Sequence, residues 1–175
     1  MKAKTKEVNE RFIWAASVID VSPADKVLEI GCGAGLLTDV IAQSLSKGKI
    51  TSVDQSASMI RMAQSRNKEH IKNGKVELVV SAFANTDFPA AAFHKIIAFN
   101  VNVFWKNPVR ELELIKKILK PKSFLYLFYQ SPYETTLEAA MPVIEKLKSN
   151  GFEVKDTMLK KLKPTSAYCI VAKPV

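Results

Sequence analysis

The sequence predicts an α/β fold of the Rossmann-like, doubly wound kind, with one mostly parallel sheet covered by helices on both faces. Short apolar runs alternate along the chain with segments whose apolar residues recur at helical spacing. The first apolar run ends in a glycine-rich segment, and the last two strand-like runs are separated by only a few residues. Strands that alternate with helices form parallel sheets, because each helix returns the chain to the same edge.

The first two strands and helices follow from residues 27–63. Residues 27–30 (VLEI) are apolar and lead into the glycine-rich segment 31–35 (GCGAG). Apolar residues then recur at helical spacing over residues 37–45, and residues 49–53 (KITSV) favour a second strand. Ser56 is a suitable cap for the helix that follows it.

Three further strands are expected at residues 76–80, 95–101 and 123–129, since each is a nearly continuous apolar run. Such runs are typical of parallel strands that are buried on both faces. Helices are predicted over residues 109–119 and from about residue 134 to residue 148.

The two ends of the chain depart from this alternation. Residues 152–162 and 166–172 are strand-like and are joined by residues 163–165 alone, so they are expected to pair antiparallel. A helical segment within residues 1–22 precedes the sheet and ends near Pro23. No long linker interrupts the sequence, and we expect one domain over residues 1–175.

Composition narrows the class of protein. The chain has 175 residues, 47% of them apolar and 25% charged, which is ordinary for a globular domain. No apolar run approaches the roughly 18–20 residues that cross a bilayer, and the N-terminus lacks the apolar core of a signal peptide, so a cytoplasmic protein is expected. Cys32 and Cys169 lack metal-site spacing and are expected to be reduced. No metal is predicted.

The net charge of +9 makes an anionic partner a possibility to test. The densest groups of lysines stand in three distant segments of the chain, at residues 2–6, 116–122 and 155–163. Scattered lysines are usually solvated surface, so a nucleic-acid partner is the less favoured interpretation.

The glycine-rich segment and two carboxylates predict a nucleotide-like ligand. Glu29 lies two residues before Gly31, and Asp54 closes the second strand, where a carboxylate can accept hydrogen bonds from both hydroxyls of a ribose. A nicotinamide cofactor favours glycine at position 36, where this chain has Leu36. The spacing suits a ligand with a methionine-like ammonium and carboxylate.

Four segments resemble the class I S-adenosylmethionine-dependent methyltransferases, in particular the small-molecule group that includes the ubiquinone and menaquinone biosynthesis enzymes. They are VLEIGCGAG (27–35), VDQSASMIRMA (53–63), DFPAAAFHKI (87–96) and ELIKKILKPKSFLYL (113–127). The resemblance implies S-adenosylmethionine as the cofactor. It also implies a seven-stranded sheet in the order 3-2-1-4-5-7-6 with an antiparallel last strand.

The resemblance assigns parts of the cofactor to residues of this chain. The family usually has an aspartate after the third strand that reads adenine, whereas this chain has Ser81-Ala82-Phe83, so adenine recognition is expected from Ser81 and the backbone amides of Ala82 or Phe83. The N-terminal segment 1–22 is expected to cover the cofactor side. The methionine part is expected at Gly31, Gly33 and Gly35, the ribose at Asp54 and the adenine near Gln55 and Met59.

The methyl acceptor is expected beyond the fourth and fifth strands, because ligands of open α/β sheets bind outside the carboxyl ends of strands. Asn100 is predicted to contact cofactor, and the acceptor is predicted to contact Asn102, Phe104, Trp105 and Tyr133. His94 is expected to be structural, and no catalytic base is assigned.

Methyl transfer to a small molecule is the function that these features favour. An RNA or DNA methyltransferase and a non-catalytic S-adenosylmethionine-binding module stay open as alternatives. The sequence leaves the acceptor and the oligomeric state undetermined.

Overall fold

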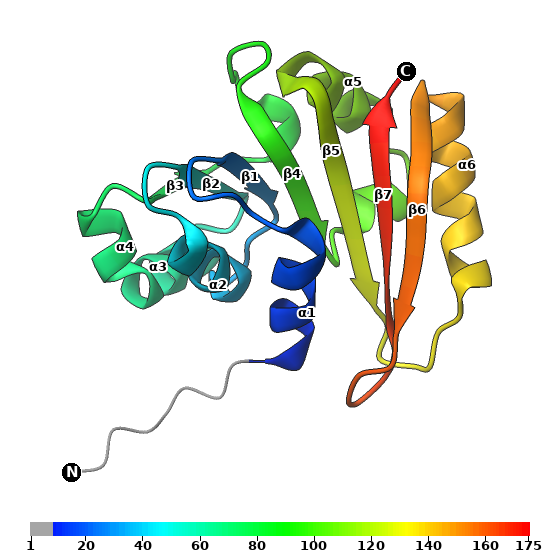
Figure 1. Cartoon of the computed structure of the whole chain (residues 1–175), viewed down its shortest axis with the longest axis horizontal. Helices are drawn as coiled ribbons and strands as arrows, with labels where there is room; N and C mark the ends of the chain where they lie inside the picture. The colour runs from blue at the N-terminus through cyan, green and yellow to red at the C-terminus, as the bar shows by residue number, and fades with distance from the viewer. Residues whose placement is uncertain (1–8) are drawn as a thin grey trace.

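A computed structural model describes residues 9–175, which contain one seven-stranded sheet in the order β3-β2-β1-β4-β5-β7-β6 (Figure 1). β1 to β5 are parallel, and β7 runs antiparallel to both of its neighbours. The expected strand order and the antiparallel β7 are therefore confirmed. The strands are β1 (Lys26–Ile30), β2 (Lys49–Asp54), β3 (Val76–Val80), β4 (Phe93–Phe99), β5 (Leu119–Gln130), β6 (Phe152–Lys160) and β7 (Ala167–Pro174).

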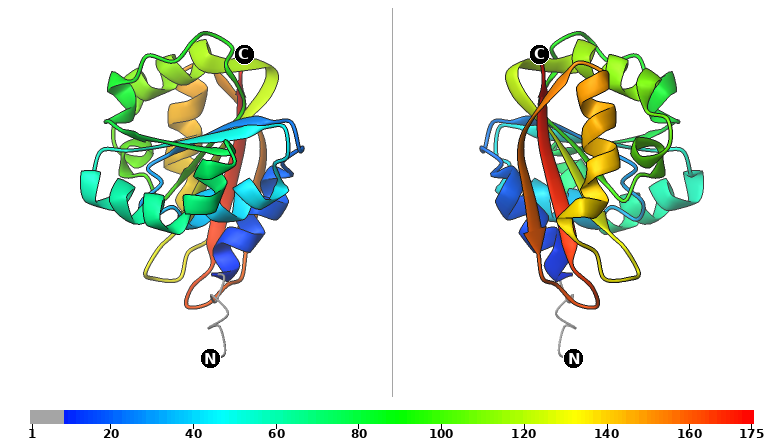
Figure 2. Two further views of the ribbon diagram at one scale, coloured as in Figure 1. Left: turned by 90° about the vertical axis from the view of Figure 1, so that its left-hand side faces the viewer. Right: turned by 90° about the vertical axis from the view of Figure 1, so that its right-hand side faces the viewer.

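Helices cover both faces of the sheet (Figure 2). One core packs α1 and α2 against the sheet, and the other packs α5 and α6. The α-helices are α1 (Glu10–Ile19), α2 (Leu36–Ser44), α3 (Ala57–Arg66), α4 (Lys68–Lys72), α5 (Val109–Ile118) and α6 (Met141–Ser149). The 3-10 helices of residues 9–175 are η1 (Phe83–Asn85), η2 (Asn102–Trp105) and η3 (Leu137–Ala140).

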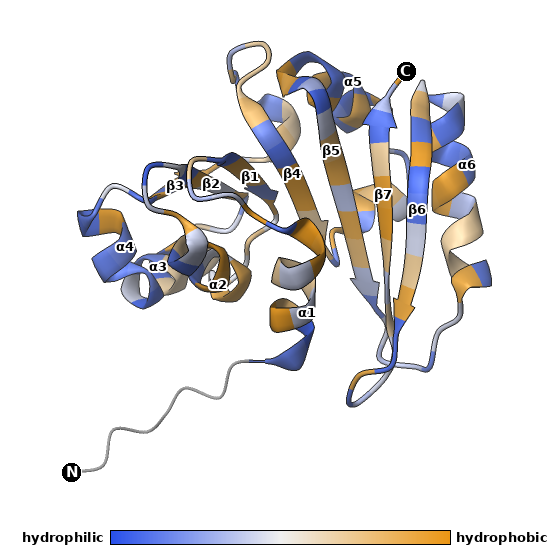
Figure 3. Ribbon diagram, viewed as in Figure 1, coloured by the Kyte–Doolittle hydropathy of each residue, from blue (hydrophilic) through white to orange (hydrophobic). Residues whose placement is uncertain are grey.

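Burial on both faces explains the apolar runs of the central strands. In β1, Val27 belongs to the core beneath α2, whereas Leu28 and Ile30 belong to the core beneath α5. Side chains alternate between the two faces of a strand, so a strand covered on both sides needs apolar residues throughout. Figure 3 shows apolar residues along β4, β5 and β7, and mostly polar ones on α3 and α4.

Two boundaries differ from the sequence-based expectation. The helix expected from residue 134 begins later, with η3 and then α6 at Met141, and Pro142 stands in the first turn of α6. Glu134 instead accepts a hydrogen bond from the amide of Ser166, which holds residues 131–136 as a loop against the start of β7. β5 begins at Leu119 rather than near Ser123, with an irregular pairing to β4.

The first part of the N-terminal helix α1 packs over the carboxyl ends of β4 and β5, and its last residue, Ile19, accepts a hydrogen bond from Lys95 near the amino end of β4. The ring of Phe12 lies 5.3 Å from that of Phe99, and the ring of Trp14 lies 5.4 Å from that of Phe128. Residues 1–8 of the expected N-terminal segment lie outside the described residues. Between residues 9 and 175, no helix is long and apolar enough to span a membrane.

Candidate functional site

The glycine-rich turn between β1 and α2 is anchored to the end of β2. The amides of Gly31 and Cys32 both donate to the carbonyl oxygen of Val53, at 2.8 and 3.1 Å. Gly31 has φ of 70°, and a Cβ at this position would lie 2.6 Å from Cγ2 of Val101. The turn therefore passes too close to the segment after β4 for any larger residue.

Gly33 and Gly35 lie in different surroundings. A Cβ on Gly33 would meet no protein atom within 4 Å, so this position faces open space that a ligand can approach. A Cβ on Gly35 would lie 2.6 Å from Nδ2 of Asn67 and 2.8 Å from Cβ of Ala63. Gly35 thus permits α2 and α3 to pack closely, in addition to its expected place beside the cofactor.

Asp54 closes β2 and holds two segments of backbone. Its Oδ2 accepts a hydrogen bond from the amide of Gly33 at 2.8 Å, and its Oδ1 accepts one from the amide of Ser56 at 2.9 Å. Each carboxylate oxygen can accept more than one hydrogen bond, so both retain capacity for a ligand hydroxyl. The carboxylate therefore fixes the turn and stands at the cavity that the turn borders.

Glu29 lies beneath the turn, on the face of β1 that α2 covers. It is buried, and its Oε2 accepts hydrogen bonds from the hydroxyls of Thr38 and Ser52 at 2.5 and 3.2 Å. Burial raises the pKa of Glu29 from an ordinary value of 4.5 to about 7, although the two hydroxyls oppose the shift. Glu29 thus supports the turn from below.

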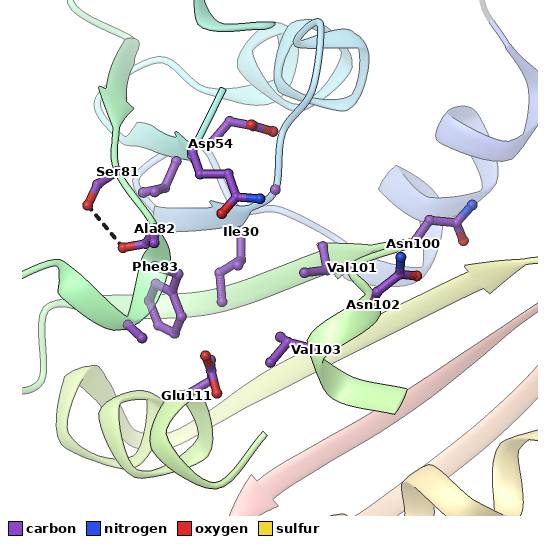
Figure 4. A pocket seen from close by; sticks show the side chains of 14 residues that line it. Ile30, Asp54, Ser81, Ala82, Phe83, Asn100, Val101, Asn102, Val103 and Glu111 are labelled. Atoms are coloured by element: carbon purple, nitrogen blue, oxygen red, sulfur yellow. Dashed lines mark hydrogen bonds between the residues drawn. The ribbon is translucent and has the colours of Figure 1, made fainter. Parts of the chain in front are cut away.

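A cavity of about 440 Å³ opens at the carboxyl ends of β1 to β4 (Figure 4). The predicted site residues that line it are Gly31, Asp54, Gln55, Ser81, Ala82, Phe83, Asn100 and Asn102. The other lining residues are not predicted from the sequence; they are Ile30, Val53, Ala84, Val101, Val103 and Glu111. Most of these residues are next to predicted site residues in the chain. Their position at or just after the end of a strand is a signal that could have identified them. Glu111 belongs to α5 and carries no signal of its own in the sequence.

Asn100 is locked in place at the end of β4. Its φ is 56°, its Oδ1 accepts a hydrogen bond from the amide of Gln130 at 2.8 Å, and its Nδ2 donates to the carbonyl oxygen of Gln130 at 3.1 Å. These paired bonds join the ends of β4 and β5 at the border of the cavity.

Seven predicted site residues lie outside the cavity lining: Glu29, Gly33 and Gly35, described above, and Met59, Phe104, Trp105 and Tyr133. Phe104 is completely buried in the core beneath α5, so the expectation that it contacts the acceptor is wrong: packing in the core determines its position. Trp105 donates from Nε1 to the hydroxyl of Tyr168 at 2.9 Å and stacks near Tyr129, so it too is held by packing. Tyr133 is 79% exposed in the loop after β5, and Met59 is 39% exposed on α3.

Cys32, Cys169 and His94 are not among the residues that line the cavity. Cys32 and Cys169 are free, and burial raises the pKa of both thiols, which keeps them protonated. His94 lies at the amino end of the sheet, where its Nδ1 accepts a hydrogen bond from the amide of Lys26. Burial and nearby Lys120 lower the pKa of His94. His94 is at the opposite end of β4 from the cavity.

The chemistry of the lining fits S-adenosylmethionine. Its ionisable side chains are the carboxyl groups of Asp54 and Glu111, which suit a ligand that carries a positive sulfonium. The open space over Gly33 admits a ligand against the backbone. The strand order, the glycine turn and this cavity define the class of S-adenosylmethionine-dependent, Rossmann-like methyltransferases.

Comparison with known proteins gives the family. A family model described as a methyltransferase domain matches residues 27–122, and the chain belongs to this family. The uncharacterized methyltransferase YdaC of Bacillus subtilis is 25% identical over 179 residues, covering 99% of this chain and 94% of its own.

Solved structures share the fold. A S-adenosylmethionine-dependent methyltransferase from Aquifex aeolicus superposes with a TM-score of 0.77 at 18% identity, over 96% of this chain and 91% of its own. Magnesium protoporphyrin IX methyltransferase from Synechocystis, solved with bound S-adenosylmethionine, gives 0.70 at 18% identity, over 94% of this chain and 76% of its own.

Proposed function

We propose that this protein transfers the methyl group of S-adenosylmethionine to a small-molecule acceptor that enters beside Asn102. The observation that carries the proposal is the cavity at the carboxyl ends of β1 to β4, which has apolar walls and carboxylates at its border. Its volume of about 440 Å³ is in the range of small-molecule sites.

In this proposal the turn at Gly31 and Gly33 holds the methionine part of the cofactor, and Asp54 accepts hydrogen bonds from the ribose. Asn100, fixed by Gln130, forms the wall next to the reacting methyl group. The cofactor supplies a methyl group that is already activated by its sulfonium. The protein contributes orientation, proximity and exclusion of water, which are large effects for a two-substrate reaction.

The lining of the cavity favours a small molecule over a nucleic acid. Sites for nucleic acids gather Lys and Arg along the path of the phosphate backbone, and none of the described residues that line this cavity is Lys or Arg. The Synechocystis neighbour is named for a small-molecule acceptor, magnesium protoporphyrin IX, which is consistent with this interpretation. We also propose that the chain forms one domain and that its N-terminal segment, described from residue 9 to residue 22, lies on the cofactor side.

The test combines ligand binding with turnover. S-adenosylmethionine and S-adenosylhomocysteine should raise the melting temperature, and NAD should not. A panel of small carboxylic acids, phenols and amines is then incubated with methyl-labelled cofactor, and label should appear in at least one of them. Cofactor binding without transfer to any small molecule, together with transfer to RNA or DNA, would reject the small-molecule acceptor; binding without any transfer would favour the non-catalytic module.

A further inference from the structure

The side chain of Glu111 lines the cavity, and the proposed function gives this carboxylate no role. It lies in the first turn of α5 and lines the cavity together with Phe83 and Val103. Within residues 9–175, no side-chain hydrogen bond or ion pair involves its carboxylate. The neighbouring Arg110 is directed elsewhere and donates to Oδ1 of Asn85 at 3.3 Å. An acceptor of this strength in a ligand cavity is suited to a donor on the ligand.

The position of Glu111 indicates which part of the ligand it meets. Figure 4 shows it on the side of the cavity opposite Asp54, next to Phe83 and Val103. α5 packs against η1, the short helix that follows β3, so Glu111 belongs to the β3 side of the cavity. With the ribose at the end of β2 and the methionine part at the end of β1, the purine is the part that extends toward β3.

The walls around Glu111 suit a flat base. Ile30, Phe83 and Val103 supply apolar surface, and the segment Ser81–Ala84 borders the same space. An adenine held there presents one strong donor at its edge, the exocyclic amino group. The methyl acceptor has to reach the sulfonium at the β1 and β4 side, next to Asn100, so it is expected away from Glu111.

We propose that Glu111 selects adenine by accepting a hydrogen bond from its exocyclic amino group. This inference rests on the cofactor positions proposed above. In a base that carries a carbonyl oxygen in place of the amino group, that oxygen would face the carboxylate of Glu111. Both groups are hydrogen-bond acceptors, so they would repel each other. Such an arrangement discriminates strongly between ligands, because the wrong base leaves the carboxylate of Glu111 without a hydrogen-bond donor.

The experiment measures the dissociation constants of S-adenosylhomocysteine and S-inosylhomocysteine by calorimetry. The second ligand differs in having the carbonyl oxygen. Wild type should prefer the adenosyl ligand by at least about tenfold, and Glu111→Gln should reduce this preference by about tenfold, because an amide can donate to the carbonyl. Glu113→Gln is the matched control, since Glu113 is exposed on the same helix and should leave the preference unchanged.

Melting temperatures verify that each variant is folded. Glu111→Asp is a second variant, in which the carboxylate is retained on a side chain that is shorter by one methylene. It should have an intermediate preference. An equal affinity of wild type for both ligands would overturn the proposal, and so would an unchanged preference in Glu111→Gln. Unchanged preference with lost methyl transfer would place Glu111 at the acceptor. If wild type bound neither ligand, the cofactor positions themselves would be rejected.

Discussion

Asp54 lies where the cavity meets the glycine turn, and its two oxygens already accept hydrogen bonds from the amides of Gly33 and Ser56. The same carboxylate is proposed to bind the ribose. Its removal would therefore affect both the local backbone and the ligand, and a measurement has to separate these two effects.

Asp54→Ala should weaken S-adenosylhomocysteine binding by at least tenfold, or roughly 1.5–3 kcal/mol, since two ribose hydroxyls lose a charged acceptor. The melting temperature should also fall modestly, because two amides lose their partner. Calorimetry measures the first effect and thermal unfolding the second. Asp87→Ala removes a carboxylate that is 97% exposed and should leave ligand affinity unchanged. Wild-type affinity in folded Asp54→Ala would place the ribose elsewhere.

Glu29 should make stability depend on pH. The pKa of Glu29 is raised to about 7 in the folded protein, above its ordinary value of 4.5, so the folded state binds more protons between these values. Stability from this group is present below about pH 4.5 and is lost as pH rises through 7. At about 1.36 kcal/mol per pKa unit, the full loss is on the order of 3 kcal/mol.

Glu29→Gln, which does not titrate, should therefore gain stability relative to wild type between pH 5 and pH 8. Urea unfolding at the two pH values measures the difference. Glu145→Gln, at an exposed position of α6, should show no such change. A constant difference between Glu29→Gln and wild type at both values would contradict a pKa of about 7 for Glu29 in the folded protein.

At the scale of elements, the turn between β1 and α2 joins three parts of the fold. It is bonded to the end of β2 through Val53, it approaches the segment after β4 at Val101, and it meets α3 at Asn67. Asn67 is buried and donates from Nδ2 to the carbonyl oxygens of Gly35 and Ala63, at 3.1 and 3.0 Å. One short segment thus borders the cavity and also fixes the packing of two helices.

Gly33→Ala and Gly35→Ala should separate these two roles. Both glycines have positive φ, so each alanine costs about 1 kcal/mol in backbone strain. Gly35→Ala should lose several degrees more of melting temperature, because its Cβ meets Asn67 and Ala63. Gly33→Ala should instead lose ligand affinity, since its Cβ enters the open space in which the ligand is proposed to lie. Thermal unfolding and calorimetry on both variants check the contrast, which equal melting temperatures would contradict.

Across the whole molecule, one group of lysines lies at the opposite end of the sheet from the cavity. Lys26, Lys95 and Lys120 gather around His94 near the amino ends of β1, β4 and β5. The cavity opens at the carboxyl ends, and its charged lining is acidic. An anionic polymer drawn to these lysines would not be presented to the cofactor.

Binding to structured RNA should therefore be weaker than micromolar at physiological salt and without preference among sequences. A salt series distinguishes surface attraction from specific binding, because affinity through several phosphate contacts falls steeply as salt rises. Submicromolar affinity together with methyl incorporation into the RNA would contradict this prediction and support a nucleic-acid methyltransferase.

The order of elements could be predicted from the sequence alone, because it depends on patterns that are local in the chain. Apolar runs such as residues 27–30 and 76–80 mark buried strands, and the 163–165 connection is too short for anything but an antiparallel pair. The glycine spacing and Asp54 also indicate the cofactor class from the sequence alone. They lie in neighbouring elements of the chain, so their relation is local as well. The start of α6 was misplaced, because the bond between Glu134 and Ser166 joins residues far apart in the chain.

Only the tertiary structure decided which side chains face the cavity. Phe104 and Asn102 are two residues apart, yet one is buried in the core and the other lines the site, because a 3-10 turn directs them differently. Glu111 reaches the cavity only because α5 packs against the segment after β3. The sequence determined the sheet, the turn and the class of ligand, which depend on local periodicity. Packing between distant segments determined the walls of the site, since those contacts exist only once the helices lie on the sheet.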